Sequence, residues 1–149
     1  MTKTRIPRSM RRRVMAEFRN QCAYCHTPTP ITGAHLVIDH IIPEVAGGRT
    51  VQENLCVACH SCNEFKGAQL EARDPLTGEH VPLFHPRQQR WREHFCWSED
   101  GSEIIGLTPV GRATVAALNM NHLAIIEARR RWAQVGWHPP QEDIRDLTL

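Results

Sequence analysis

Asp39 and His40 stand together at the end of an apolar run, and Asn63 and Lys66 follow one helical turn apart. A histidine titrates near neutral pH and can take a proton from water. The oxygens of Asp39 and Asn63 are the hard ligands that Mg²⁺ or Mn²⁺ prefers. Such an ion can bind a phosphate oxygen and stabilise a leaving alkoxide. Lys66 would share a helix face with Asn63 and neutralise further phosphate charge. These residue types suit the hydrolysis of a phosphodiester bond.

The cysteines form a second group with regular spacing. Cys22 and Cys25 make one Cys-x-x-Cys pair, and a second pair is either Cys56 with Cys59 or Cys59 with Cys62. Two such pairs place four thiolates around one tetrahedral Zn²⁺. We prefer Cys59 and Cys62, since the residues before Cys59 are expected to form a strand and a turn after it suits a metal-binding knuckle. The sequence therefore predicts a structural zinc held by Cys22, Cys25, Cys59 and Cys62.

Each knuckle sequence is followed by a histidine, His26 or His60, and so also matches the attachment pattern of c-type haem. Attachment of that kind belongs outside the cytoplasm, and the basic first 20 residues contain no apolar export signal. No apolar run approaches the roughly 18 residues that a membrane span needs. We therefore expect a cytoplasmic protein with free thiols, no membrane partner and no organic cofactor.

The basic residues of the chain are concentrated and are almost all arginine. Only two of the 18 are lysine, and the first 20 residues hold seven basic residues against one acidic residue, although the formal net charge is only +2. A basic arm on a near-neutral body is typical of a polyanion-binding protein, and arginine suits phosphate recognition. A solvated helix face is the alternative interpretation. We expect Arg11, Arg12 and Arg13 to bind nucleic acid, together with Lys66.

The order of these motifs resembles the HNH endonuclease family, whose catalytic unit is a ββα fold around one metal ion. The matching stretch, about residues 22–67, contains Ile38–Pro43, Gly47–Gly48, Glu53–Leu55, Cys59–Asn63 and Lys66–Gly67. The resemblance implies that His40 is the general base and that Asp39 is the first metal ligand. It implies that Asn54 holds the active-site loop and orients the base. Asn63 takes the last place, where many members have histidine.

The same resemblance implies a substrate and a role for the zinc. It implies cleavage of DNA, which we expect to be double-stranded, with Mg²⁺ or Mn²⁺ as the catalytic ion, and products with a 5′-phosphate and a 3′-hydroxyl. The four-cysteine site resembles the structural zinc of the cysteine-bearing branch of the family. A competing class is a zinc-ribbon module that binds nucleic acid without cutting it. The two classes differ in whether Asp39, His40 and Asn63 meet at one ion.

The sequence predicts an α+β fold in three parts. We expect a basic arm and helix at 1–21, a zinc-stapled ββα unit at 22–72, and an accessory region of hairpin and helices at 73–149 that packs on it. Successive strand residues point to opposite faces, so Asp39 and His40 can serve one site only if the strand bends. Pro43 and the following glycines permit this, and we expect an irregular strand end at 39–42.

Local signals give the remaining elements. We expect a helix over 10–19 capped by Ser9, with Met10, Val14 and Phe18 on one face. Strands are expected over 35–42 and 54–58, followed by a helix from about 62 to 72. Further elements are expected in the last third of the chain: a hairpin of 94–98 with 103–107, a helix over 109–119 capped by Thr108, and a helix that Asn121 caps and Gly136 ends.

Overall fold

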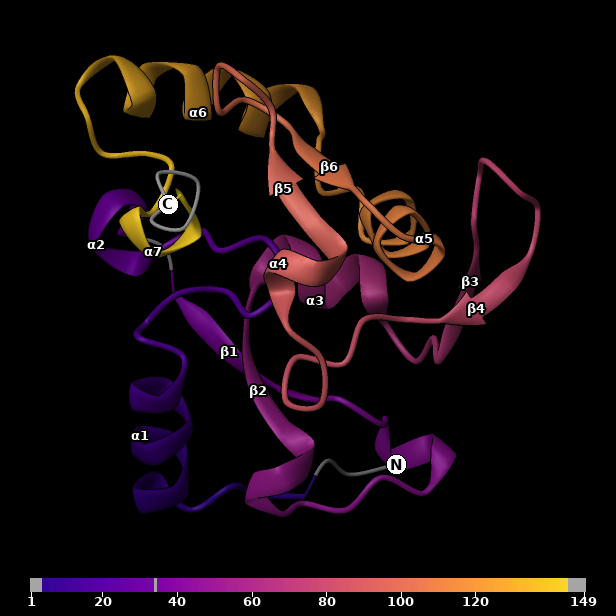
Figure 1. The fold of residues 1–149 in the computed structure, drawn as a ribbon. Coiled ribbons are helices and arrows are strands. Elements are labelled where there is room, and N and C mark those ends of the chain that lie inside the picture. Colours follow the sequence, from indigo (N-terminus) through magenta and orange to yellow (C-terminus); the bar gives the residue numbers. More distant parts are fainter. Residues whose placement is uncertain (1–3, 34, 145–149) are drawn as a thin grey trace. The chain divides into compact units, whose positions relative to one another are not determined.

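The computed structural model describes residues 4–33 and 35–144. The protein has the predicted α+β fold, with short antiparallel strand pairs and helices (Figure 1). The chain divides into two compact units: Met1–Leu70 with His85–Gln89, and Glu71–Phe84 with Arg90–Leu149. Within the described ranges, no helix is both long and apolar enough to cross a membrane.

The first unit contains the expected ββα arrangement, preceded by a helix. Its elements are α1 (Arg8–Glu17), α2 (Thr29–Thr32), β1 (Leu36–His40), the short 3-10 helices η1 (Glu44–Ala46) and η2 (Gln52–Asn54), β2 (Leu55–Cys59) and α3 (His60–Lys66). Strands β1 and β2 pair in antiparallel register, with Leu36 opposite Cys59 and His40 opposite Leu55. The hairpin is the platform on which the other elements of this unit pack.

Helix α1 packs on this hairpin through a small apolar core (Figure 1). Val14 of α1 is fully buried against Leu36, Leu55 and Val57 of the two strands. Met10 and Phe18 pack at its edge, so the predicted stripe of α1 is confirmed. The predicted cap at Ser9 is wrong, because the helix begins at Arg8 after Pro7 and has no side-chain cap. The basic residues of α1 stay on its exposed side.

Helix α3 starts immediately after β2. The Cys59 side chain caps it by accepting a hydrogen bond from the Cys62 amide. The helix ends at Lys66 because Gly67 adopts φ 52°, a left-handed value that favours glycine. The predicted continuation to Ala72 is wrong, since that residue lies in a strand of the second unit.

A short segment from later in the chain, His85–Gln89, belongs to the first unit. Arg87 holds it there. Its guanidinium donates to the Leu55 carbonyl at 2.7 Å, forms an ion pair with Glu17, and lies over the Phe18 ring at 5.1 Å. The segment therefore connects α1 and β2 although Arg87 lies 70 residues beyond Glu17 and 32 residues beyond Leu55 in sequence.

The second unit consists of two hairpins and four helices among the described residues. Its elements are β3 (Glu71–Arg73), β4 (His80–Pro82), α4 (Trp91–His94), β5 (Phe95–Trp97), β6 (Ile104–Gly106), α5 (Pro109–Ala117), α6 (Leu123–Gln134) and α7 (Gln141–Ile144). The hairpin of β5 with β6 and the Thr108 cap of α5 are confirmed. The predicted cap at Asn121 is wrong: His122 caps α6, and Asn121 instead bonds both backbone groups of Ile104.

Two buried charged groups fix the second unit. Asp74 is fully buried and receives two hydrogen bonds of 2.9 Å from the Arg112 guanidinium. Arg129 of α6 is 1% exposed, donates to the carbonyls of Ser102 and Met120, and lies over the Trp97 ring. These contacts join residues that are far apart in sequence.

Candidate active site

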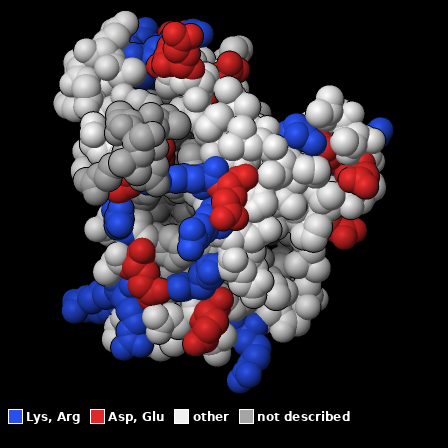
Figure 2. Space-filling model, in the orientation of Figure 1, with Lys and Arg blue, Asp and Glu red and all other residues white. Residues whose placement is uncertain are grey.

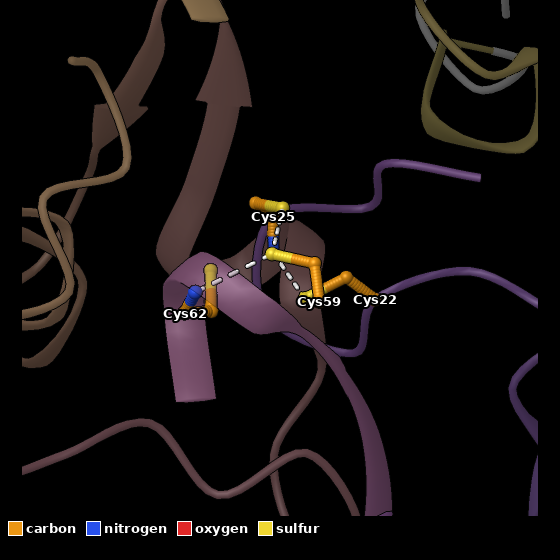
Figure 3. A group of neighbouring side chains, drawn as sticks. All are labelled: Cys22, Cys25, Cys59 and Cys62. Atoms are coloured by element: carbon orange, nitrogen blue, oxygen red, sulfur yellow. Dashed lines mark hydrogen bonds between the residues drawn. The ribbon is translucent and has the colours of Figure 1, made fainter. Parts of the chain in front are cut away.

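The four cysteines preferred from the sequence meet at one point (Figure 3). The sulfurs of Cys22, Cys25, Cys59 and Cys62 lie within 4.8 Å of one another, with 3.7 Å between those of Cys25 and Cys59. A tetrahedral ion with Zn–S bonds of about 2.3 Å separates its sulfurs by about 3.8 Å. The cluster is therefore compatible with a structural zinc. Cys56 faces elsewhere, which decides between the two possible pairs.

Two elements supply the zinc cluster. The first knuckle is a tight turn closed by hydrogen bonds between Cys22 and Thr27 and between His26 and Cys22, and β2 with α3 supplies the other two thiols. Hydrogen bonds from the other three thiols lower the pKa of Cys25, whereas burial raises the pKa of Cys22. Four thiolates at this separation would repel one another, so the cluster suits a cation that offsets their charge.

Asp39 lies in β1 with its carboxylate turned into the interior. Lys66 Nζ is 3.1 Å from Asp39 Oδ2, and the side chains are 2% and 7% exposed. Lys66 also donates to the His40 carbonyl at 3.0 Å. The residue predicted to meet phosphate in solvent is thus buried as the partner of Asp39 in this structure.

Two further side chains contact the same carboxylate. The Tyr24 hydroxyl donates to Asp39 Oδ2 at 3.0 Å, and Cys56 Sγ lies 3.7 Å from that oxygen. Burial is the main cause that raises the pKa of both the Tyr24 hydroxyl and the Cys56 thiol, and the negative charge of Asp39 raises both further. Both groups therefore stay protonated and can act as donors. Tyr24 was not identified from the sequence, where its only signal is an aromatic residue between two predicted zinc ligands.

His40 is the last residue of β1 and contacts the loop that follows. Its Nε2 lies 2.9 Å from Thr50 Oγ1 and 3.8 Å from Glu44 Oε1. Thr50 in turn donates to Glu44 at 3.4 Å. A hydrogen bond from Thr4 and the nearby His40 lower the pKa of the Glu44 carboxyl. Neither Thr50 nor Glu44 was identified from the sequence, because their positions depend on the path of the loop.

Asn54 fastens this loop at both ends. Its Oδ1 accepts from the Ile42 amide at 2.8 Å, and its Nδ2 donates to the carbonyls of Ile42 and Arg49 at 3.0 and 2.9 Å. Gly48 lies inside the same turn, where an added Cβ would fall 1.7 Å from the Ile42 carbonyl oxygen. The loop can close this tightly only with these two residue types.

A groove of about 940 Å³ brings the predicted catalytic residues together. Asp39, His40 and Asn63 all line it, as do Arg5 and Arg11. Arg12 and Arg13 are exposed on α1 but do not line the groove, and Arg13 instead bonds Gln52. Figure 2 shows basic side chains gathered over the part of the molecule where α1 lies in Figure 1. The groove thus brings a carboxylate, an imidazole, an amide and two guanidinium groups to one place in the first unit.

The geometry of β1 differs from the prediction. The ladder with β2 is regular through Asp39 and His40, so the irregular backbone begins at Ile41. The sheet has only two strands, and β1 is an edge strand. Four successive residues of β1, Val37 to His40, line the groove, and successive strand residues point to opposite faces. Asp39 and His40 therefore both line the groove without the predicted bend of the strand.

Comparison with known proteins identifies the class of this segment. Residues 22–74 match the model of the HNH endonuclease family, so the resemblance found in the motifs is confirmed over these residues. A stretch of 48 residues is 48% identical to the CRISPR-associated endonuclease Cas9 of Corynebacterium diphtheriae. The match covers 32% of this chain and 4% of that protein, so the chain spans a small fraction of its relative. No solved structure matches the chain.

Proposed function

We propose that this protein is a metal-dependent endonuclease that hydrolyses phosphodiester bonds of DNA. One observation carries the proposal: the groove places Asp39, His40 and Asn63 beside Arg5 and Arg11, within the segment that matches the HNH family. A scissile phosphate in this groove would meet a general base, oxygen ligands for a cation and two guanidinium groups.

His40 is the general base in this proposal, and its contacts favour one tautomer. The Thr50 hydroxyl donates a hydrogen bond to Glu44, so its oxygen can accept a hydrogen bond from His40 Nε2. The neutral imidazole then carries its proton on Nε2 and leaves Nδ1 free to take a proton from the attacking water. Glu44 stabilises the imidazolium that forms. Asn54 contributes by holding the loop that carries Glu44 and Thr50.

Asp39 and Asn63 would hold the catalytic ion, for which we propose Mg²⁺ or Mn²⁺. Their carboxylate and amide oxygens are suitable ligands. Tyr24, Cys56 and the closer Lys66 contact all involve Asp39 Oδ2, whereas among the described residues Oδ1 receives only Lys66 at 3.4 Å. Oδ1 therefore retains a lone pair for a cation. The bound ion would polarise the phosphate and stabilise the leaving oxygen.

Zn²⁺ in the four-cysteine cluster has a structural role in this proposal. The four clustered sulfurs would fill all four positions of a tetrahedral Zn²⁺, so no ligand position is left for a substrate. The turn that it closes is tied to the hairpin by a 2.7 Å hydrogen bond from the Ala23 amide to the Val57 carbonyl. The zinc would thus stabilise the unit that carries the groove.

Nicking of supercoiled plasmid by the purified full chain tests the proposal. We expect cleavage with Mg²⁺ or Mn²⁺, none with a chelator added to block those ions, and products with 5′-phosphate ends. His40→Ala should lower the single-turnover rate by about 10²–10⁴-fold, the usual contribution of a general base. His80→Ala, the same change on the exposed side of β4, is the matched control and should cleave normally.

Two outcomes would contradict this function. Equal cleavage by His40→Ala and the parent protein would remove His40 from the reaction. Zinc-dependent DNA binding without cleavage under any divalent ion would instead identify a binding module.

A further inference from the structure

The zinc turn and the proposed catalytic carboxylate are joined by a single buried side chain. Tyr24 lies between Cys22 and Cys25, is fully buried, and donates its hydroxyl to Asp39 at 3.0 Å. We infer that Tyr24 is a positioning residue, through which the zinc turn sets the orientation of the Asp39 carboxylate for the divalent ion. This inference rests on the proposed function.

The backbone of the turn gives Tyr24 little freedom. Zinc would bind Cys22 and Cys25 on either side of it. The neighbouring Ala23 amide donates a hydrogen bond to the Val57 carbonyl of β2. Asp39 is opposite Cys56 in the β ladder, next to Val57. The turn and the carboxylate are therefore attached to the same stretch of β2, and the hydroxyl of Tyr24 spans the short gap between them.

The contact also determines which carboxylate oxygen is available. Tyr24 occupies Oδ2 together with Lys66, and this leaves Oδ1 as the less occupied acceptor. Without the hydroxyl, Asp39 keeps its charge partner Lys66 but loses the closer of the two neutral donors at Oδ2, and only the Cys56 thiol at 3.7 Å still distinguishes the two oxygens. The Lys66 ammonium group can then pair more closely with Oδ1. Partners of this kind, which touch a ligand and not the ion, commonly change metal affinity or activity by 10–100-fold when removed.

The first test is direct binding of Mn²⁺ to the zinc-loaded full chain, measured by electron paramagnetic resonance of the free ion. Tyr24→Phe removes only the hydroxyl, and we expect the Mn²⁺ concentration for half-saturation to rise about tenfold or more. Zinc content should stay at one per chain. Thr32→Val removes an exposed hydroxyl from nearby α2 and should bind Mn²⁺ like the parent. Cleavage by Tyr24→Phe should recover at high Mn²⁺.

A second measurement is made on the parent protein and does not depend on how Tyr24→Phe folds. Tyr24 is the only tyrosine of the chain, so protein labelled with ¹³C at the tyrosine Cζ gives one resonance. Adding diamagnetic Mg²⁺ should shift that resonance in the parent protein and leave it unchanged in Asp39→Asn.

The outcomes distinguish failure of this inference from failure of the proposed function. The inference is wrong if the parent protein cleaves DNA and binds Mn²⁺ but its tyrosine resonance does not shift and Tyr24→Phe binds Mn²⁺ with the parent affinity. That result leaves the nuclease proposal intact. A parent protein that neither binds Mn²⁺ nor cleaves overturns both. A shifted resonance with weakened binding in zinc-loaded Tyr24→Phe supports the positioning role.

Discussion

Lys66 and Asp39 form a buried ion pair, with 3.1 Å between Nζ and Oδ2, at the junction of α3 and β1. The pair joins the helix that carries Asn63 to the strand that carries His40. A buried charge destabilises the folded protein when its oppositely charged partner is removed. This relationship leads to the first prediction.

Lys66→Met should destabilise the protein by about 3–5 kcal/mol near neutral pH, because it leaves the buried Asp39 carboxylate without its counter-charge. Urea denaturation, followed by the fluorescence of the chain, measures the loss. The double variant Lys66→Met/Asp39→Asn should recover much of it, since no unpaired charge remains. A loss below about 1 kcal/mol in the single variant would show that the pair is not structurally important.

Asn54→Ala should lower the free energy of unfolding by about 2–3 kcal/mol, since three hydrogen bonds of about 1 kcal/mol each are lost. The cleavage rate at saturating metal should fall as well, because the loop bearing Thr50 loses its clamp. Denaturation and single-turnover cleavage measured together separate the two effects. Full activity in a destabilised Asn54→Ala would argue against a role of the clamp in orienting His40.

Cys59→Ser should abolish the binding of one zinc per chain, measured by metal analysis of the purified protein. It should also unfold much of the first unit, because structural zinc can contribute about 10 kcal/mol to folding. Cys96→Ser is the matched control, since Cys96 lies in β5 outside the cluster and should leave the zinc content unchanged. Equal zinc in both variants would rule out the four-cysteine site.

Asp74 makes the stability of the second unit dependent on acid. Two hydrogen bonds from Arg112 hold the pKa of the buried Asp74 carboxyl well below its usual range. The stabilisation is fully present above the unfolded-state value of about 3.9 and is lost as the pH falls toward the depressed native value. The stability advantage of the parent over Asp74→Asn should therefore shrink steadily from pH 5 to pH 2.5 in urea denaturation. Glu99→Gln makes the corresponding change at an exposed position and is the matched control.

Arg11→Gln should weaken DNA binding and reduce the slope of log affinity against log salt by about one, as expected when one phosphate contact is lost. Arg131→Gln removes an exposed arginine of α6 that pairs with Glu127, and should leave the slope unchanged. Fluorescence anisotropy across a salt series compares the two. Identical slopes for Arg11→Gln and the parent would place the DNA elsewhere than the groove.

Short-range patterns in the sequence predicted much of this fold. The Thr108 cap depends only on residues next to it, and the stripe of α1 depends on helical spacing alone. The choice of Cys59 and Cys62 also followed from a local argument, the end of a strand. Such features are decided within one or two turns of chain and so are visible before any tertiary contact is known.

What the sequence could not supply was the direction in which side chains point after packing. Helical spacing placed Lys66 near Asn63, but it could not show that the helix turns Lys66 inward to Asp39. The sequence around Tyr24 does not predict its hydrogen bond to Asp39. It also does not predict that Gly67 adopts a positive φ and ends α3 there. Each of these depends on contacts between elements that are distant in sequence or on a backbone angle selected by the whole unit.

Arg87 shows that the family-matched segment depends on residues outside it. The match covers residues 22–74, but the Leu55 carbonyl accepts a hydrogen bond from Arg87, and the core that holds the hairpin includes Val14 of α1. A fragment limited to residues 22–74 would lack both contacts. The part of this chain that keeps the packing of the first unit therefore extends beyond the matched segment on both sides.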